Sequence, residues 1–450
     1  MGIRKKLHLR YDGKSYSVPH APYTMDKAQK QAFCDFISVK FPDGFASNIA
    51  THITTDGCNL QGLKTHHCHI LLQRILPVAI RGIMHKDIYE ALAELAKFFQ
   101  QLCSKTLKVD VLHRMKAKIP IILCKLEKIF SPSFFNVMLH LAVHLPDEAL
   151  LRGPVQYGWM YPVERRLYTL KRFVRSMARP EGSIAEAYVA NECLHACSWH
   201  FDDLDTRHNR EGRNRERVDL SRGDLSIFQH GVDLLGASRV TYLKHDYEKM
   251  VWFVLNNCPE VEPYIEICRK EFVEKGILDV KKTLEKQFSS WFKKHGEEVP
   301  DGLYALSCDQ DLRVRKFSGC LVDGIRFHTT DRDKNRKTQN SGVMTEGTHD
   351  GDPIEFYGSF KEIIELQYNS DLSNSWTVVL FRCDWYDTNA KSSRMKDDGF
   401  FRSINCANCW YKDDPFILAT QATKIFYLKD TAKNAEGWSV VQKFTHKTPM

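Results

Sequence analysis

The 450-residue sequence lacks the features that mark several large protein classes. It has no run of roughly 18 unbroken apolar residues, so we expect no membrane-spanning helix and no membrane partner. Its basic first residues, MGIRKKLHLRYDG, contain no apolar segment of a secretory signal, so we expect a protein that is not secreted. It also has no G-x-G-x-x-G, P-loop, G-x-S-x-G or H-E-x-x-H motif. Dehydrogenase, nucleotide-hydrolase and serine-hydrolase functions therefore lose their usual sequence support.

The cysteines, the net charge and the length of the chain limit its cellular compartment, its partners and its number of domains. The 14 cysteines are scattered without the framework of a small disulfide-bonded domain, so we expect reduced thiols in the nucleus or cytoplasm. The formal net charge of +8 suits an anionic partner but is modest for this length. The length allows two or three domains, and a hydrophobic content of 43% predicts that most of the chain folds.

Apolar periodicity separates a helical part of the chain from a β-rich part. A helical period predicts helices at residues 23–41 (capped by Thr24), 82–106, 120–145, 163–177, 183–201 and 243–295. Beyond Pro300 the period becomes two, which predicts strands from LYALSC (303–308) onward and a hairpin turn at Asp323-Gly324. We therefore predict an α+β fold that is mainly α-helical in its N-terminal two-thirds, with a small C-terminal β-barrel or sheet domain.

Glu164 lies in the segment VQYGWMYPVERRLYTLKRF, between an aromatic run and a group of basic residues. Pro162 suits the first turn of a helix, so a carboxylate at Glu164 interacts favourably with the helix dipole. It could instead be one arm of a two-metal phosphoryl-transfer site, but such a site needs two or three converging acids. Spacing alone favours the first interpretation.

Three groups of residues could bind a metal ion, each on a weak pattern. His140 and His144 have the i, i+4 spacing of one helix face, although Pro146 interrupts the helix before Glu148. Two half-buried, hydrogen-bonded histidines explain this pattern better than a metal site does. His67 and Cys68 lie in the run THHCHI, where adjacent residues point in different directions. The single C-x-x-C motif, CANC at 406–409, has no second pair.

Basic residues cluster at three places, each beside aromatic residues. Such clusters are usually solvated surfaces, but their aromatic neighbours favour nucleic-acid binding through phosphates, with a steep salt dependence. One cluster is in the polar segment 205–224. The DNA-binding candidates come from the other two: Arg165, Arg166, Lys171, Arg172 and Arg175, and Arg332, Lys334, Arg336 and Lys337.

Long stretches of the chain resemble plant CACTA (En/Spm-type) transposases, over about residues 1–446. The resemblance rests on GLKTHHCHILLQRILPVAIRG, on residues 144–194 around GPVQYGWMYPVERRLYTLKRF, on SGCLVDGIRFHTTDRDKNRKTQNSGV, and on the C-terminal FYGSFKEIIELQY, VVLFRCDWYD and YKDDPFILATQATKIFYLKD. In that family these segments belong to two domains of unknown function after the transposase core and to the connector between them. The family usually has Asp at the position of His67.

The resemblance implies an RNase H-like core in which three acids hold two Mg²⁺ ions for DNA transposition. Glu164 would match the third acid, with the helices at 82–145 as an insertion. The first two acids lie upstream of the segment that matches residue 1, so we expect no strand cleavage by this chain alone. No cofactor is expected unless the ancestral Mg²⁺ site is completed. Expected partners are DNA and a full-length transposase or other transposon proteins.

The resemblance and the periodicity together predict a sequence of regions. They are the end of the transposase core (1–60), a helical transposon-associated domain (61–204), a polar loop (205–225), a helical extension (226–298), a β-hairpin connector (299–339) and the β-rich domain (340–446). The expected function is DNA or protein binding in the nucleus or cytoplasm. The alternatives are a chromatin-binding module with no enzymatic role, an inert remnant, and an active Mg²⁺-dependent nuclease that uses Glu164.

Overall fold

The chain divides into two compact units, which are described separately. The computed structural model describes residues 8–17, 20–45, 49–54, 59–200, 225–228, 232–236, 239–242, 246–295, 301–307, 313–349, 351–369, 375–389, 394–411, 415–432 and 437–444. The first unit comprises Met1–Cys34, Lys64–Arg213 and Lys447–Met450, and the second comprises Asp35–Leu63 and Asn214–His446. The predicted polar loop at 205–225 lies almost wholly outside the described residues.

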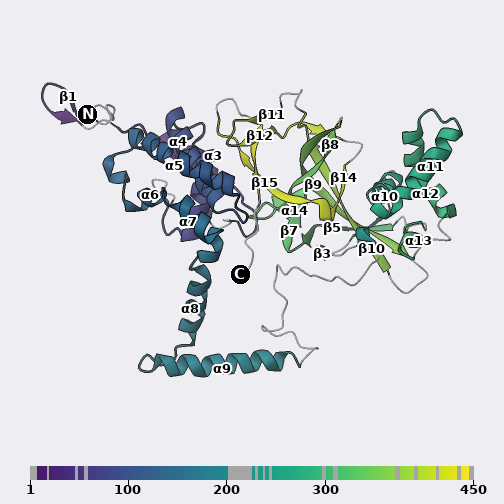
Figure 1. Cartoon of the computed structure of the whole chain (residues 1–450), viewed down its shortest axis with the longest axis horizontal. Helices are drawn as coiled ribbons and strands as arrows, with labels where there is room; N and C mark the ends of the chain where they lie inside the picture. The colour runs from purple at the N-terminus through teal and green to yellow at the C-terminus, as the bar shows by residue number, and fades with distance from the viewer. Residues whose placement is uncertain are drawn as a thin grey trace. The chain divides into compact units, whose positions relative to one another are not determined.

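The first unit is helical apart from a short hairpin of β1 (Arg10–Tyr11) and β2 (Tyr16–Ser17). Its helices are α2 (Thr65–Ile70), α3 (Leu76–Ile80), α4 (Lys86–Leu102), α5 (Val109–Ile129), α6 (Val137–Leu141), α7 (Leu145–Arg152), α8 (Tyr161–Phe173) and α9 (Pro180–Ser198) (Figure 1). A five-residue π-helical turn, Leu71–Ile75, joins α2 to α3. Helix α1 (Lys27–Ile37) crosses the boundary between the units.

The core of this unit forms where α4, α5 and α7 pack together. Apolar residues of α4 recur at three- and four-residue intervals and are buried, including Ala91, Leu95 and Leu102. On α5 the buried stripe runs from Leu112 to Leu126 and continues across Pro120. This cluster takes up no residue of α8 or α9, so those two helices lie outside it.

Each region predicted as helical contains helix, but several ends differ, and the region 120–145 holds the end of α5, a 3-10 turn at Pro132–Phe134 and α6 in place of one helix. Helix α5 begins well before residue 120 and ends at Ile129, because its apolar stripe starts at Leu112. Helix α8 ends at Phe173 because Val174 is extended. The N-terminal end of α1 is closed by Asp26 rather than Thr24, since Asp26 and Gln29 exchange side-chain-to-backbone hydrogen bonds of 2.7 and 2.9 Å.

The second unit is built around an antiparallel sheet of eleven strands (Figure 1). Its main order is β11 (Met395–Asp397), β12 (Arg402–Asn405), β16 (Trp438–Lys443), β15 (Thr423–Lys429), β8 (Gly342–His349), β9 (Asp352–Asn369), β10 (Ser375–Tyr386) and β13 (Cys409–Trp410). Three strands pair outside this path: β14 (Phe416–Leu418) with β10, β5 (Arg313–Phe317) with β9, and β4 (Arg239–Tyr242) with β5.

The 18-residue strand β9 organises the sheet. One of its edges pairs with β10, and the other pairs first with β8 and then with β5. A bulge at Lys361 shifts the β9–β10 register, so Phe360 and Ile363 both enter one hydrophobic cluster while Ile364 enters another. The long ladder therefore has a core on each side.

Helices cover one end of this ladder. They are α10 (Tyr247–Asn256), α11 (Glu262–Glu274), α12 (Val280–His295) and α13 (Asp301–Ser307). Their apolar faces, with Phe288 and Phe292 fully buried, pack against residues of β9 and β10 such as Leu366 and Leu380. A second cluster covers the sheet with the three-stranded sheet of β3 (Val232–Leu235), β6 (Gly319–Val322) and β7 (Ile325–His328).

The α+β class and a C-terminal sheet are confirmed, and so is the hairpin turn, where Asp323 and Gly324 have φ values of 47° and 74°. The strand predicted from LYALSC is wrong for its described residues, because Leu303 to Ser307 lie in α13. A closed barrel is also wrong for the described strands, since their order runs from β11 to β13 without closing. The sheet is larger than expected because β4 and β5 join it from before residue 340. The relation to an RNase H-like core stays a prediction.

Among the described residues, no helix combines the length and the apolar character needed to cross a membrane.

Candidate functional site

Helix α8 presents Glu164 and its neighbouring basic residues at the surface. No α8 residue is buried, and Glu164 lies in the first turn, where its backbone N–H donates to the Met160 carbonyl at 2.8 Å. The nearby Tyr161 has its pKa raised, mainly by burial and then by the negative charge of Glu164. Within the described ranges, no group of three or more His, Cys, Asp or Glu side chains is placed to hold a metal ion.

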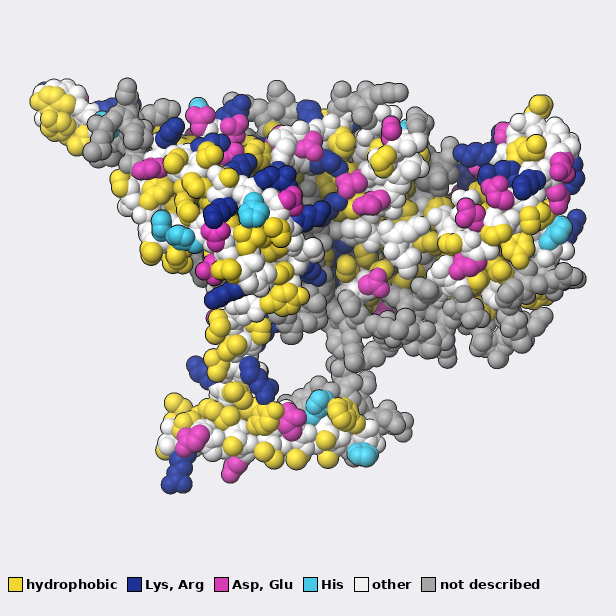
Figure 2. Space-filling view, in the orientation of Figure 1, with side chains coloured by type: hydrophobic (Ala, Val, Ile, Leu, Met, Phe, Trp, Pro, Cys, Tyr) yellow, Lys and Arg dark blue, Asp and Glu magenta, His cyan; other side chains and the backbone are white. Residues whose placement is uncertain are grey.

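The basic side chains around α8 are exposed. They are Arg165, Arg166, Lys171 and Arg172 of α8 and Arg175 just beyond it. Arg166 lies over the ring of Tyr188, 5.0 Å from its centre. No carboxylate that the structure describes forms an ion pair with the other four. Figure 2 shows Lys and Arg side chains flanking α8 near its junction with α9.

At 100° per residue, Arg165 and Arg172 share one side of α8 with Tyr168, while Val163, Leu167 and Leu170 form a stripe on the opposite side. Exposed guanidinium groups without carboxylate partners are free to make bidentate contacts with phosphates. The first side of α8 therefore has the chemistry of a nucleic-acid contact surface.

The histidine candidates are only partly brought together. The Nε2 atoms of His140 and His144 lie 3.4 Å apart, and both side chains are exposed rather than half-buried. Glu148, one turn further along, pairs with Arg152 at 3.6 Å. The structure thus brings two imidazoles together at the surface, whereas the Glu148 carboxylate pairs with Arg152.

His67 and Cys68 point in different directions, as adjacent helical residues do. The His67 side chain is buried, and its Nδ1 accepts a hydrogen bond from the Lys64 backbone N–H at 3.4 Å, whereas the Cys68 thiol is exposed. The two cysteines of the C-x-x-C motif, Cys406 and Cys409, form no disulfide bond. Eleven described cysteines are free thiols, but Cys34 is disulfide-bonded, which departs from the expectation of reduced cysteines.

The second basic cluster does not form one surface. Arg332 and Lys334 lie on α14 (Thr330–Lys334), which is capped by the Thr329 hydroxyl. Arg332 is half-buried and donates to the Ser318 hydroxyl at 3.0 Å, and Lys334 pairs with Asp331 at 2.7 Å. Arg336 and Lys337 are exposed.

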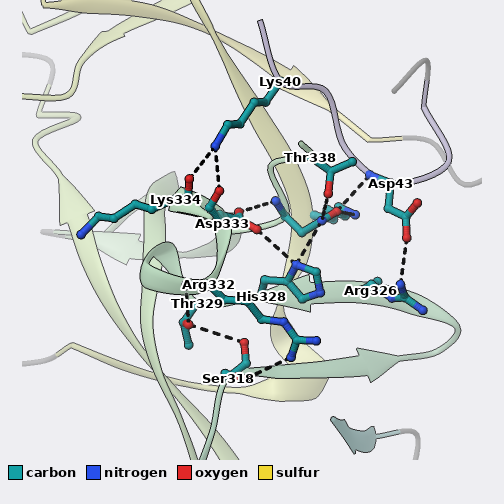
Figure 3. A network of polar contacts seen from close by, with 12 residues as sticks. Lys40, Asp43, Ser318, Arg326, His328, Thr329, Arg332, Asp333, Lys334 and Thr338 are labelled. Carbon is teal, nitrogen blue, oxygen red and sulfur yellow. Dashed lines mark hydrogen bonds and ion pairs between the residues drawn. The ribbon is translucent and has the colours of Figure 1, made fainter. Parts of the chain in front are cut away.

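A buried polar network lies directly beneath this cluster (Figure 3). His328, at the end of β7, contacts the Asp333 carboxylate through its Nδ1 atom at 3.1 Å. The other Asp333 oxygen accepts from the backbone N–H of Asn340, and the Asn340 side-chain oxygen accepts from Lys424 at 2.7 Å. All four side chains are nearly inaccessible to solvent.

The network ties segment 35–63 to the connector. Lys40 donates to the Asp333 and Lys334 carbonyls at 2.8 and 3.0 Å, and Asp43 pairs with Arg326 at 3.0 Å (Figure 3). The two hydrogen bonds from Lys40 give partners to backbone carbonyls at the C-terminal end of α14. The same segment packs the rings of Phe41 and Phe45 against Phe426 of β15.

Burial dominates the electrostatics of the network. It lowers the pKa of Lys424 to about 7, although the charges of Asp43 and Asp333 act in the opposite direction. Because the Lys424 side chain is 2% exposed, its amine has no access to a solvent-borne substrate. The arrangement therefore holds the fold together through paired polar groups and is not a catalytic centre.

Sequence reasoning missed this network. His328, Asp333 and Asn340 all lie in the connector segment 318–343, whose basic residues alone drew attention to it. A signal was present, because Thr329 followed by Asp333 is the start of a short capped helix directly after a strand. Lys424 carried no such signal, since only the fold places it beside Asn340.

Comparison with known proteins finds two domains. Residues 102–215 match a Domain of unknown function (DUF4218), which spans α5 to α9, and residues 364–441 match a Domain of unknown function (DUF4216), which spans the end of β9 to β16. Domains of these two kinds are typical of plant transposase-derived proteins. No curated protein and no solved structure matches the chain.

Proposed function

We propose that the chain is the C-terminal part of a CACTA-type DNA transposase and that it binds DNA through α8 without cleaving it on its own. The two matched domains support a transposon-derived origin. The quoted resemblance supports the CACTA type, and it matches only Glu164 to one of the three metal-binding acids. A full-length transposase or another transposon protein in the nucleus would supply cleavage.

The observation that carries the DNA-binding proposal is the exposed side of α8. Arg165 and Arg172 lie seven residues apart, which is about 10 Å along a helix. Successive phosphates of one strand are 3.4 Å apart along the duplex axis, so two flexible guanidinium side chains at this spacing can contact phosphates of the same strand. Such contacts position a protein on DNA without reading its sequence.

A salt titration of DNA binding tests the proposal. We expect the affinity of the full chain for a labelled duplex, measured by fluorescence anisotropy, to fall steeply with salt. In Arg165→Ala/Arg172→Ala the slope of log K against log salt should be smaller by about 0.9 for each phosphate that the variant no longer neutralises. Arg114→Ala/Lys118→Ala is the matched control, because it removes two exposed charges from α5 that already pair with Asp110 and Glu94.

Two outcomes would overturn the proposal. Equal slopes for the two double variants would remove α8 from the DNA contact, and affinity that ignores salt would end electrostatic binding altogether. Cleavage is tested with supercoiled plasmid and Mg²⁺, where we expect no nicking. Mg²⁺-dependent nicking that Glu164→Gln abolishes would replace the non-catalytic proposal with an active nuclease.

A further inference from the structure

Helices α8 and α9 bury very few side chains for their length. No residue of α8 is buried, and in α9 only Ser198 is. The two helices meet near their junction, where the Ser176 backbone N–H donates to the Ser183 hydroxyl at 3.1 Å (Figure 1). Neither contributes to the hydrophobic cluster of α4, α5 and α7.

Both helices nevertheless carry exposed apolar side chains. On α8 the stripe of Val163, Leu167 and Leu170 includes Leu167 at 59% exposure. On α9, Val189 and Leu194 are 60% and 55% exposed, and apolar residues occur on all sides of the helix. Figure 2 shows hydrophobic side chains along the length of α9. Apolar side chains of a helix are normally buried, so the exposed apolar residues of α9 form a surface suited to a partner.

The charges of the two helices are complementary. Helix α8 carries four basic residues against one acidic residue, Glu164. Helix α9 carries three acidic residues and neither Lys nor Arg; the acids are Glu181, Glu186 and Glu192. A surface that matches α9 must be apolar and basic, and a surface that matches α8 must be apolar and acidic. A second copy of this chain supplies both.

We propose that two copies of the chain associate through α8 and α9, with α8 of each copy packed on α9 of the other. Such an interface is self-complementary and closes on a two-fold axis. The 13 residues of α8 extend about 20 Å and the 19 residues of α9 about 29 Å, so α9 covers the whole of α8. The stripe of α8 faces α9 of the other copy, and Arg166 and Lys171, which flank that stripe, face its acids, so that Arg166 leaves the ring of Tyr188 in its own chain.

The dimer leaves the proposed DNA contact exposed. Arg165 and Arg172 lie on the side of α8 opposite the apolar stripe, so DNA binding and self-association use different faces of one helix. Substitutions in α9 consequently change association without removing a DNA-binding residue. An experiment can therefore contradict self-association and leave the DNA contact of α8 intact, or the reverse.

Sedimentation of the full chain over a range of concentrations, with a thiol reductant and without DNA, tests the dimer. We expect a reversible dimer whose dissociation constant rises roughly tenfold or more in Val189→Glu, because Val189 lies between Glu186 and Glu192 on α9 and the change places a charge in the apolar contact. Ile121→Glu is the matched control, since Ile121 on α5 is 58% exposed and lies outside the interface. Equal circular dichroism spectra show that the variants are folded.

Charge reversal provides an independent test. Arg166→Glu/Lys171→Glu makes α8 acidic like α9, and Glu186→Lys/Glu192→Lys makes α9 basic like α8. In each variant the two helices then repel each other, so each variant alone should stay monomeric. A mixture of the two variants should dimerise, because both of its helix pairs are again complementary. The proposal would be overturned if the wild-type chain were monomeric throughout, or if its dimer were unchanged by the α9 substitutions. It would also be overturned if Ile121→Glu weakened the dimer equally, or if the mixture of the two variants did not associate.

Discussion

At the scale of single residues, burial determines the role of a polar side chain more than its sequence pattern does. Lys424 lies in β15, a strand in which consecutive residues are buried, and its amine donates to Asn340 and lies 4.4 Å from the centre of the Phe444 ring. Glu164 is the opposite case. Its environment is an exposed first turn, which is where a carboxylate interacts favourably with the helix dipole.

The depressed pKa of Lys424 gives a pH dependence of stability with a definite sign. With a pKa of about 7 in the folded protein against an ordinary value of 10.5, the folded protein has released a proton that the unfolded chain still binds between these pH values. Unfolding free energy therefore rises with pH in that window, by at most about 1.4 kcal/mol for each pH unit.

Lys424→Met isolates this contribution. We expect the difference in unfolding free energy between wild type and variant to grow in favour of wild type from pH 7 to pH 9, as measured by denaturant unfolding. Lys429→Met, on an exposed position of the same strand, is the control. A difference that does not change with pH would mean that the Lys424 amine stays charged in the folded protein.

At the scale of elements, periodicity located the helices, but contacts set their ends. Helix α5 extends across Pro120 because apolar residues on both sides of it pack on α4. LYALSC alternates like a strand, yet its described residues are helical, because Leu303, Ala305 and Leu306 enter the cluster formed with α10 to α12. A six-residue apolar pattern suits either structure, so tertiary packing decides.

Strand β8 contains two glycines in different surroundings. At Gly342 an added Cβ would lie 2.5 Å from the backbone oxygen of Ile425 on β15, whereas at Gly347 it would lie 3.0 Å from the ring of Phe356. We expect Gly342→Ala to destabilise the second unit by about 1–3 kcal/mol, because a backbone cannot move as a side chain does.

Thermal unfolding measures this effect, with Gly347→Ala as the control in the same strand. The control should cost less, since the Phe356 ring can rotate away. A Gly347→Ala variant that is as unstable as Gly342→Ala would show that the close approach of β8 and β15 is not the cause.

At the scale of the whole molecule, the two units have separate hydrophobic clusters. One cluster of the first unit lies around α4 and α5, and clusters of the second unit lie on both sides of its sheet. Units with their own cores can unfold as separate steps.

We therefore expect two calorimetric unfolding transitions. Gly342→Ala should lower only the transition of the second unit, and Leu95→Ala, which opens a cavity between α4 and α5, should lower only that of the first unit by about 2–5 kcal/mol. A single transition that both substitutions shift equally would contradict independent unfolding.

The sequence by itself determined the α+β class, the main helices, the hairpin at Asp323-Gly324 and the exposed basic helix α8. These features depend on local periodicity, turn chemistry and charge, which lie within a few neighbouring residues. Only the tertiary structure decided the open eleven-stranded sheet, the buried network of His328, Asp333 and Asn340, and the uncovered faces of α8 and α9. Each of these depends on which distant segments come together, and strand pairing and burial leave no local mark in the chain.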